Sequence, residues 1–572
     1  MGCSASNMNN AFGTEWTRDE PKTSIQHNDV NMSSNEMNKW DVGTAGDLPA
    51  TFNSNSSSTR RSWLDRNVDD YYDELDEALN HIHSKNKINE LLSLLGPDEL
   101  YCDPDFPADV SSLSYIEGMW EEQGIEWLRP KDITGAHQTA RLLSEGVSRD
   151  DIMQGSVGDC WFLSACAAVS QKPKFMQKII PYDQPLCGKD YNGVVHFRFW
   201  RFGKWMDVFI DDRLPTKHGH LIFAHCLNPA EFWIALLEKA YAKLHGCYEA
   251  IEGGQTMDAL VDLTGGLAER YELNSSDYTM FGHIQKAYRS GAFIACSKKG
   301  DWRNSNEADA NGLVSGHAYT LTNVLKIRHQ KGEVKLVRIR NPWGDGTEWK
   351  GSWSDKDSNW KWVDDDTKNR MNFNRKPDGE FWMSYKDFCK HFTEVTICTI
   401  GPDYDGDGVS DKAGCVLMTN GKWVSEESAG GSRNDLQKFA TNPQFLISLE
   451  EPDDFDVDED DPDTEGKCSI VICLMQLPKF QRGKSPARSL LQIGFVLYRT
   501  KKPDSRLPGK HFRYNYDSGK SGVYINYREV SARFELEPGH YVLIPSTFNP
   551  NDSAMFRIRA FSEKKFTMKS LE

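Results

Sequence analysis

The amino-acid sequence predicts an α+β fold followed by an antiparallel β-sandwich, with a disordered leader in front of both. Three observations support this prediction. The first 68 residues are polar and lack an apolar period, apolar helices alternate with aromatic-rich strands up to residue 400, and short strands separated by turns follow. At 572 residues the chain also exceeds the roughly 250–300 residues at which a single core stops growing. We therefore expect several domains.

Residues 1–68 form the predicted leader, which is crowded with Asn, Ser, Thr and Asp. Its first residues satisfy the pattern for myristoylation of Gly2, and Cys3 follows as an acceptor for palmitoylation. One myristoyl chain binds a membrane only marginally, so the second chain is what would make the attachment stable. We expect acylation at both residues, although so short a motif also occurs by chance.

The pattern of apolar residues divides the rest of the chain into a helical segment, a section of helices and strands, and a section of strands. Residues 69–98 carry a helical apolar stripe that ends at Gly96-Pro97, and we expect this stripe to pack on the neighbouring domain. In the section up to residue 400, Phe232–Tyr241 is typical of a buried helix and Val195–Trp200 of a strand. Beyond residue 401 we predict sandwich strands at Phe445–Leu449, Ser469–Met475, Gln492–Tyr498 and His540–Ile544.

Composition excludes several classes of function. The formal net charge of −17 makes nucleic acid an unexpected partner, because phosphates would be repelled. The 13 cysteines include no C-x-x-C pair, which argues against a zinc site and against a disulfide framework. No apolar run reaches the roughly 20 residues of a membrane span, and the N-terminus lacks a secretory signal. We expect a cytoplasmic protein.

The most informative segment runs from Gln154 to Val169, where a glycine-punctuated loop feeds an apolar helix. This pattern places Cys160 at the helix N-terminus, whose partial positive charge favours a thiolate over a thiol. Taken alone, a cysteine at this position more often serves core packing. The side-chain amide of Gln154 and the backbone N–H of Cys160 can, however, form a two-donor oxyanion hole. We therefore predict that Cys160 is a nucleophile.

A catalytic thiolate needs a base and a group that orients the base. His317 lies roughly 150 residues downstream of Cys160, as in papain-like enzymes. It follows a glycine and precedes a β-prone run, which predicts the start of a strand. Asn341 can accept the imidazole N–H without adding charge, and Trp343 can shield that bond from water. A lone histidine is more often a satisfied core or surface residue.

Together the segments Gln154–Trp161, Gly316–Tyr319 and Arg340–Gly344 resemble calpains, which are calcium-dependent thiol proteases. Flanking segments resemble the same family, namely Asp103–Ala108, Trp127–Lys131, Leu214–Thr216, Glu238–Lys243 and Gly379–Trp382. The resemblance is strong over residues 100–400 and weaker in the sandwich. It implies a two-lobed papain-like core, with the nucleophile on a first lobe at 99–254, His317 and Asn341 on a second lobe at 255–400, and a calpain-type sandwich at 401–572.

The resemblance also implies calcium activation, with one ion bound in each lobe. In the first lobe the matching positions are Ser144, Gly146, Asp151 and Glu231; in the second they are Glu348, Asp355, Lys376, Asp378 and Glu380. Ser144, Gly146 and Lys376 would bind through backbone carbonyls. Calcium takes six to eight oxygen ligands from carboxylates and loop carbonyls, so the residue types suit it. The alternative is that these are ordinary solvated acids, which the chain has in abundance.

Two further acidic segments are candidate calcium sites. Asp403–Gly408 begins like an EF-hand loop, yet Gly414 stands where a bidentate glutamate is needed, so we predict a linker turn. Residues 450–465 are mostly Asp and Glu. They form either a solvated loop or a loop that holds calcium or docks on basic residues of the core. Because the sequence ends at Glu572, after the sandwich, pairing with a penta-EF-hand small subunit is not expected.

The expected function is limited proteolysis of protein substrates by a calcium-dependent intracellular cysteine endopeptidase. The alternative from another class is a non-catalytic regulatory scaffold that binds calcium and membranes. A papain-fold transferase such as a transglutaminase is disfavoured, because those enzymes usually have Asp where this chain has Asn341. Membrane contact is expected through the acylated N-terminus and the β-sandwich.

Overall fold

The structure is a computed structural model that describes most of the chain beyond residue 85. The described residues are 86–93, 95–96, 99–115, 124–135, 138–143, 151–181, 184–273, 280–300, 307–401, 414–455, 462–477 and 490–571. The predicted leader, with Gly2 and Cys3, and the EF-hand-like segment Asp403–Gly408 lie outside them. Within the predicted helical segment 69–98, residues 86–93 are helical. The predicted fold, α+β followed by an antiparallel sandwich, is confirmed.

The first lobe comprises the elements from η3 to α6; the predicted boundary at 254/255 put α6 in the second lobe, but its apolar side chains belong to the core around α3. Its helical elements are η3 (Val110–Ser112), α2 (Pro130–Thr134), α3 (Cys160–Val169), α4 (Pro173–Ile179), α5 (Trp233–His245), η6 (Glu249–Ile251) and α6 (Thr256–Thr264). Its strands are β1 (Glu126–Leu128), β2 (Ile152–Met153), β3 (Val194–Arg201), β4 (Lys204–Asp211), β5 (Leu214–Lys217), β6 (His220–Leu221) and β7 (His225–Cys226). They pair as small antiparallel sheets, β1-β5-β6, β2-β7 and β3-β4.

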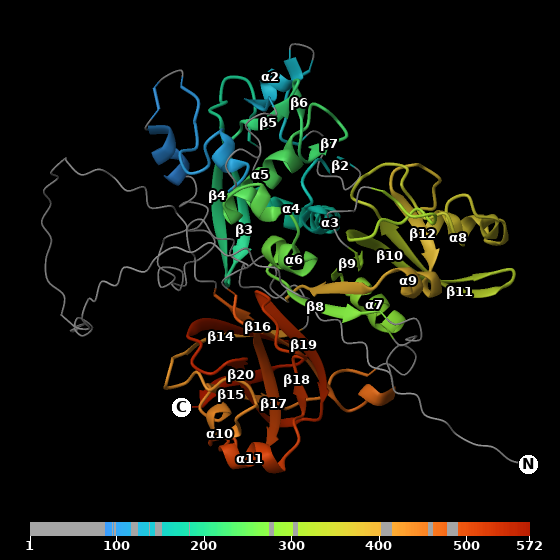
Figure 1. Ribbon diagram of the computed structural model, residues 1–572. Helices are drawn as coiled ribbons and strands as arrows, with labels where there is room; N and C mark the ends of the chain where they lie inside the picture. Colours follow the sequence, from blue (N-terminus) through green and yellow to red (C-terminus); the bar gives the residue numbers. More distant parts are fainter. Residues whose placement is uncertain are drawn as a thin grey trace, which may run out of the picture. The chain divides into compact units, whose positions relative to one another are not determined.

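Helix α3 forms the centre of this lobe, because all ten of its residues are buried. It packs against α6, as Figure 1 shows. Helix α6 ends at Gly265, which adopts a left-handed backbone with φ of 69°. A Cβ atom at this position would lie 2.8 Å from the ring of Trp200, so the close packing of the helix end requires glycine.

The second lobe is built on one antiparallel sheet of six strands, in the order β12-β11-β10-β9-β13-β8. The strands are β8 (Leu267–Glu272), β9 (Phe293–Lys298), β10 (His317–His329), β11 (Gly332–Arg340), β12 (Glu380–Ser384) and β13 (Glu394–Thr399). Helical elements α7 (Met280–Arg289), η8 (Ser358–Trp362), α8 (Asp365–Arg370) and α9 (Tyr385–His391) accompany the sheet. In the hairpin of β10 and β11, Thr320 pairs with Arg340, so the start of β10 and the end of β11 lie together.

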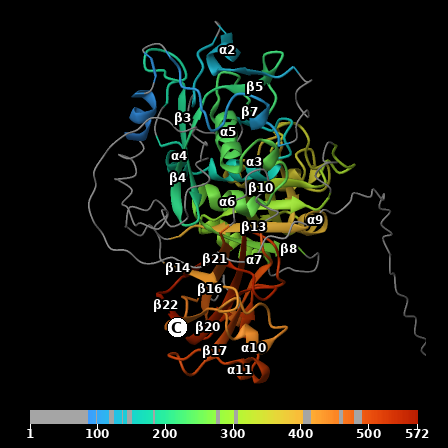
Figure 2. The same ribbon diagram turned by 60° about the vertical axis from the view of Figure 1, so that its left-hand side comes forward.

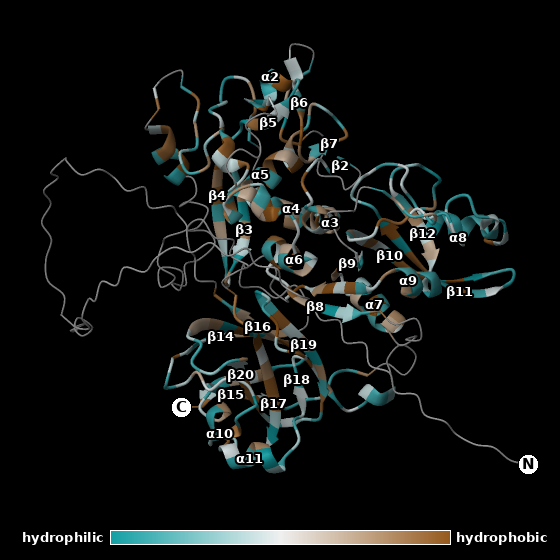
Figure 3. Cartoon of the chain, in the orientation of Figure 1, coloured by the Kyte–Doolittle hydropathy of each residue, from teal (hydrophilic) through white to brown (hydrophobic). Residues whose placement is uncertain are grey.

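The sandwich consists of two antiparallel sheets, β14-β21-β16-β19 and β18-β17-β20-β15-β22. The strands are β14 (Cys415–Trp423), β15 (Gln444–Leu449), β16 (Cys468–Gln476), β17 (Ile493–Thr500), β18 (Gly519–Lys520), β19 (Glu529–Leu536), β20 (Gly539–Thr547), β21 (Ala554–Ser562) and β22 (Phe566–Leu571). Helices α10 (Leu436–Phe439) and α11 (Gly509–Tyr514) lie together at one end in both views (Figures 1 and 2), and η9 (Pro462–Thr464) precedes β16. Apolar side chains of both sheets form the core, and Figure 3 shows β16 and β17 as hydrophobic strands. All four strands predicted for this region are present.

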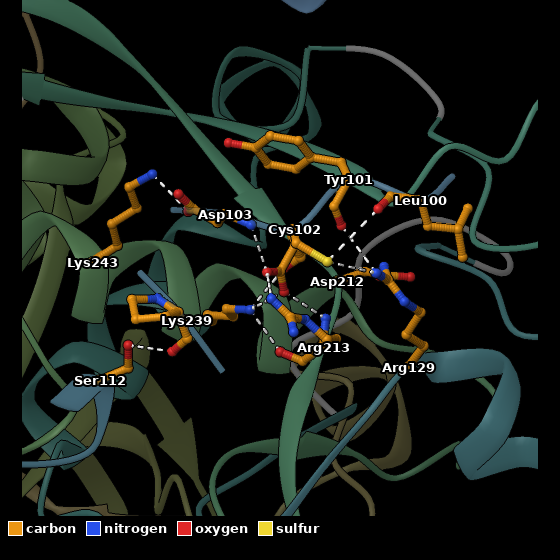
Figure 4. A network of polar contacts seen from close by, with 12 residues as sticks. Leu100, Tyr101, Cys102, Asp103, Ser112, Arg129, Asp212, Arg213, Lys239 and Lys243 are labelled. Carbon is orange, nitrogen blue, oxygen red and sulfur yellow. Dashed lines mark hydrogen bonds and ion pairs between the residues drawn. The ribbon is translucent and has the colours of Figure 1, made fainter. Parts of the chain in front are cut away.

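A network of buried ions fixes the segment that precedes the first lobe's helices (Figure 4). Lys243 of α5 donates to the Asp103 carboxylate at 2.6 Å, and Lys239 donates to Asp211 at 2.7 Å. The backbone N–H of Asp103 donates to Asp211 at 2.8 Å, which joins the two pairs. Burial alone would raise the pKa of Asp211, but Lys239 and Arg213 hold it below its usual value. The two lysines of α5 therefore lie inward because each has a carboxylate partner.

The sandwich makes polar contacts with the last turn of α6, the connection that follows it and β8. Arg528 donates to Asp262 at 2.8 Å and Arg533 to Glu269 at 2.9 Å. Arg559 donates to the carbonyl of Gly265 at 2.8 Å. Among the helices that the structure describes, none is long and apolar enough to cross a membrane.

The buried pair of Arg559 and Glu529, on the face of the sandwich that contacts the end of α6, yields a stability prediction. The two side chains are joined at 2.9 Å and are at most 1% exposed. We expect Arg559→Met to lower the free energy of unfolding by about 3–5 kcal/mol, because it leaves a buried carboxylate without its partner. The double variant Arg559→Met with Glu529→Leu should recover much of this loss. Denaturant unfolding followed by tryptophan fluorescence measures both, and equal losses in the two variants would contradict the prediction.

Candidate active site

Cys160 is the first residue of α3, as the sequence predicts, and Asp159 occupies the N-cap position. The carbonyl of Asp159 accepts the backbone N–H groups of Phe162 at 2.8 Å and Leu163 at 3.1 Å, which closes the first turn. Gly155 in the preceding loop lies so close to Phe223 that a Cβ atom would meet its backbone at 2.3 Å. The loop is therefore closely packed against Phe223, and hydrogen bonds fix the first turn of the helix.

The electrostatic surroundings of Cys160 differ from the sequence-based expectation. Burial raises the pKa of the thiol to about 12, and the charge of Asp159 adds to this rise. The backbone N–H groups of Ala318 and Trp161 oppose it. The helix N-terminus was expected to favour the thiolate, but in this conformation desolvation outweighs that effect, because the side chain is only 7% exposed.

His317 and Asn341 lie in hydrogen-bond contact. Nε2 of His317, at the start of β10, is 2.8 Å from Oδ1 of Asn341, which directly follows β11. The ring of Trp343 lies beside the imidazole, with ring centroids 5.3 Å apart. Burial lowers the pKa of His317 to about 4, although the bond to Asn341 partly opposes this effect. The imidazole is therefore neutral at physiological pH.

The hydrogen bonds around Asn341 define the tautomer of His317. Oδ1 of Asn341 also accepts the backbone N–H of Trp343 at 3.1 Å, and Nδ2 donates to the carbonyl of Thr347 at 3.2 Å. This arrangement fixes the amide orientation and makes Oδ1 an acceptor, so Nε2 of His317 carries the proton. Nδ1 is left as the basic nitrogen of the ring.

Strand β10 brings the base close to the nucleophile's helix. The hydroxyl of Thr320 donates to the carbonyl of Ser164 in α3 at 2.7 Å, and the thiol of Cys160 faces the backbone N–H of Ala318. Cys160 and His317 are both within the described part of the chain, and no hydrogen bond joins them. The structure thus brings the predicted nucleophile and base to adjacent positions without a direct bond between them.

Gln154 is held within its own loop. Its Nε2 donates to the carbonyl of Val157 at 2.9 Å, while its Oε1 is buried without a partner among the described residues. One N–H of the amide is therefore engaged within the loop.

In the first lobe the structure describes two of the four predicted calcium ligands. Asp151 directly precedes β2, and its carbonyl accepts the backbone N–H of Leu227 at 2.9 Å. Glu231 is 3% exposed. Burial raises the pKa of Cys226 in β7, and so do the charges of both carboxylates. Asp151 and Glu231 are thus near one residue, while Ser144 and Gly146 lie outside the described residues.

In the second lobe four of the five predicted ligands interact. Burial, together with the charges of Glu348, Asp378 and Glu380, raises the pKa of Asp355 to about 7. The carboxylate of Glu348 accepts the backbone N–H of Gly379 at 3.0 Å. Lys376 is exposed, so its carbonyl belongs to a surface loop.

The geometry of these acids is looser than a finished metal site. Glu380 accepts the hydroxyl of Thr322 at 2.7 Å, and Arg338 lies 3.5 Å from the same oxygen. Across the described ranges, no three His, Cys, Asp or Glu side chains converge as metal ligands. The donors are nevertheless the hard oxygens that calcium takes, and their mutual repulsion is of the kind that a cation relieves.

The acidic segment of the sandwich faces a basic helix of the second lobe across a cavity. Asp453 and Glu563 line the cavity together with Lys286 and Arg289 of α7. Asp453 accepts the backbone N–H of Ser469 at 2.8 Å, which anchors the start of the segment. This arrangement agrees with the alternative in which the segment docks on the core, but residues 456–461 lie outside the described ranges.

One pair of acidic residues beside Cys160 was not predicted from the sequence. Asp159 is fully buried, and Glu238, in the middle of α5, is 1% exposed. A glutamate inside the apolar run of α5 was the available signal, since an acid is almost never fully buried without a partner.

Comparison with known proteins places these features in a family. Residues 101–399 match the family described as "Calpain family cysteine protease", and residues 419–561 match "Calpain large subunit, domain III". Calpain-B of Drosophila melanogaster is 42% identical over 487 residues, which cover 83% of this chain and 51% of that protein. Calpain-9 of Rattus norvegicus is 40% identical over 496 residues, covering 86% and 69% of the two chains.

The Calpain-2 catalytic subunit of Gallus gallus is 41% identical over 478 residues, which cover 81% of this chain and 66% of that protein. The described structure therefore holds a cysteine-protease core joined to a domain III sandwich. The chain belongs to the calpain family of cysteine proteases. It spans about half to two thirds of the length of these relatives.

Proposed function

We propose that the chain is a calcium-dependent cysteine endopeptidase that cleaves protein substrates at limited sites, with Cys160 as nucleophile, His317 as base and Asn341 as orienting residue. The observation that carries this proposal is the 2.8 Å bond between His317 and Asn341, at the end of the strand that packs on the helix of Cys160. This bond leaves the basic Nδ1 of His317 available for the thiol proton.

The reaction follows from these positions. His317 takes the proton of Cys160, and the thiolate attacks the peptide carbonyl to form a C–S bond. The backbone N–H of Cys160 and the free N–H of Gln154 stabilise the oxyanion. The C–N bond then breaks as His317 returns the proton to the leaving amine. Water, deprotonated by His317, hydrolyses the thioester and restores the thiol.

The described conformation suits a resting state of such an enzyme. The thiol is protonated, the base is neutral and no hydrogen bond joins the two residues. Calcium, when bound, would supply positive charge to the carboxylates of each lobe. The residues that would hold it are Asp151 and Glu231 with the carbonyls of Ser144 and Gly146 in the first lobe, and Glu348, Asp355, Asp378 and Glu380 with the carbonyl of Lys376 in the second.

The same observations favour one alternative, a scaffold that binds calcium and membranes without turnover. A thiol with a pKa of about 12 is a poor nucleophile, so a chain that stays in this conformation would not cleave peptides. The two proposals differ in whether calcium induces turnover that depends on Cys160.

We expect Cys160→Ala and His317→Ala to lower kcat by about 10⁴-fold or more, because each removes a group that takes part in bond making. Asn341→Ala should leave a weak remnant of activity, since it only orients the base. Calcium-dependent cleavage of casein by the purified variants measures this. Unchanged activity of Cys160→Ala would rule out the protease proposal, and inactive wild type would favour the scaffold.

Chelation of calcium should silence the enzyme, and the variants Asp151→Asn and Asp378→Asn should each raise the calcium concentration needed for half-maximal activity. Each change removes a full charge from a set of oxygen ligands. The matched control is Asp365→Asn, because this carboxylate of α8 is 91% exposed. The control should keep the wild-type calcium requirement. Full activity in excess chelator would contradict calcium dependence.

We further propose that the protein is cytoplasmic and partly membrane-bound through acylated Gly2 and Cys3. Gly2→Ala should move it to the soluble fraction and leave proteolysis unchanged, while Cys3→Ser should give an intermediate distribution, since one myristoyl chain holds weakly. Fractionation of expressing cells, with and without chelator, measures the distribution. If wild type and Gly2→Ala partition alike, the motif is a chance match and the sandwich with its acidic segment 450–465 remains the membrane candidate.

A further inference from the structure

Two buried carboxyl groups lie beside the proposed nucleophile. Asp159, the N-cap residue of α3, is 0% exposed, and Glu238 of α5 is 1% exposed. The first turn of α3 packs on α5 here, because the rings of Phe162 and Tyr241 stack with centroids 4.1 Å apart, and the two carboxyl groups shift each other's pKa. Since Asp159 directly precedes Cys160, this contact links the proposed nucleophile's helix to α5.

The hydrogen bonds of the two groups are unequal. Both carboxylate oxygens of Glu238 share the backbone N–H of Ala224, at 3.2 and 3.1 Å. Among the described residues, no neighbouring N–H donates to either side-chain oxygen of Asp159. A buried carboxylate without a donor is costly, and the group within its reach is the Glu238 carboxyl, which donates only when it is protonated.

The charges around the pair point to the same arrangement. Within the described part of the chain, no lysine, arginine or histidine offsets the two acids. The titratable groups that do face them are Cys160 and Cys166 of α3 and Tyr248 after α5. Two adjacent carboxylates in such surroundings cannot both ionise, so one proton has to remain.

We propose that Asp159 and Glu238 share one proton and act as a positioning pair for the nucleophile, with Glu238 donating a hydrogen bond to Asp159. This inference rests on the proposed role of Cys160. Burial raises the pKa of both groups, and the charge of Asp159 raises that of Glu238 further, which makes Glu238 the proton carrier.

The pair has a mechanical and an electrostatic consequence. Mechanically, it fixes the residue whose carbonyl closes the first turn of α3, and thereby the direction of the Cys160 backbone N–H that faces the oxyanion. Electrostatically, it holds a single negative charge next to the thiol, which keeps the thiol protonated in the resting state. Loss of the shared proton would add a second charge and disfavour the thiolate further.

The first test measures the thiolate directly. Iodoacetamide alkylation of Cys160 is followed by peptide mass spectrometry as a function of pH, in chelator, on the full chain. Asp159→Asn should speed alkylation at pH 7.5 by about tenfold or more, because it removes the charge beside the thiol. Glu238→Gln, whose amide can still donate to Asp159, should follow wild type near neutral pH and exceed it at alkaline pH.

The control variant is Glu394→Gln in β13. Burial raises the pKa of this carboxyl as well, but its charge does not act on Cys160. The control should keep the wild-type alkylation profile. If Asp159→Asn also keeps it, the proposed electrostatic role is overturned.

The second test measures the shared proton through stability. Glutamate has a pKa of about 4.3 in the unfolded chain, and a carboxyl with a raised pKa in the folded state stabilises the fold below that pH. This stabilisation is lost as the pH rises toward the pKa of the folded state. Glutamine does not titrate, so Glu238→Gln lacks this pH-dependent contribution. The melting temperature of Glu238→Gln relative to wild type should therefore increase between pH 4.5 and 8, and a difference that stays constant with pH would overturn the proposal.

The positioning role is separated from a merely structural one by kinetics. Glu238→Leu removes the donor and should lower kcat at least tenfold with KM within about twofold, while Glu238→Gln recovers most of the loss. Equal loss in both variants would contradict the proposed hydrogen bond. Alkylation and melting need no turnover, so they test the pair even if the chain proves not to be a protease.

Discussion

The packing of β10 against α3 is the constraint on which the site depends. One strand carries His317, the proposed base, the N–H of Ala318 that faces the thiol, and the hydroxyl of Thr320 that binds the carbonyl of Ser164. Because successive residues of a strand point to opposite faces, the strand can present a side chain to one neighbour and a backbone group to another. The hairpin with β11 then sets Asn341 within 2.8 Å of the imidazole. The contacts of β10 therefore hold His317 beside Asn341 and near the helix of Cys160.

Burial of this site decides its charge state. A thiol pKa of about 12 means that the thiolate is disfavoured by about 4 kcal/mol relative to an ordinary cysteine. A helix N-terminus typically contributes about 0.3–1 kcal/mol toward an anion, so it cannot offset the desolvation. The same burial lowers the pKa of His317 to about 4. A thiolate and imidazolium pair of Cys160 and His317 would require a conformation in which the two ions solvate each other.

Much of this could be predicted from the sequence, and the limits have physical causes. The starts of α3 at Cys160 and of β10 at His317 follow from local signals, glycines before an apolar run and a β-prone run after a glycine. The sandwich strands follow from short β-prone runs separated by turns. The pKa of Cys160 could not be predicted, because it depends on desolvation by segments distant in sequence. The contact between Asp159 and Glu238 has the same origin, since it joins residues of two helices.

The contacts of the sandwich give the remaining link between the domains. Its arginines bind Asp262, Gly265 and Glu269, which lie between the last turn of α6 and the middle of β8. This segment is also where the chain passes from the core around Cys160 to the sheet that carries His317. Gly265 in this segment has a left-handed backbone that packs against Trp200. Asp262 accepts Arg528 of the sandwich and Arg201 of β3, both at 2.8 Å, so one buried carboxylate joins the sandwich to the first lobe. The sandwich is therefore bound at the connection between the core around Cys160 and the sheet of His317, although it contributes no residue to the site.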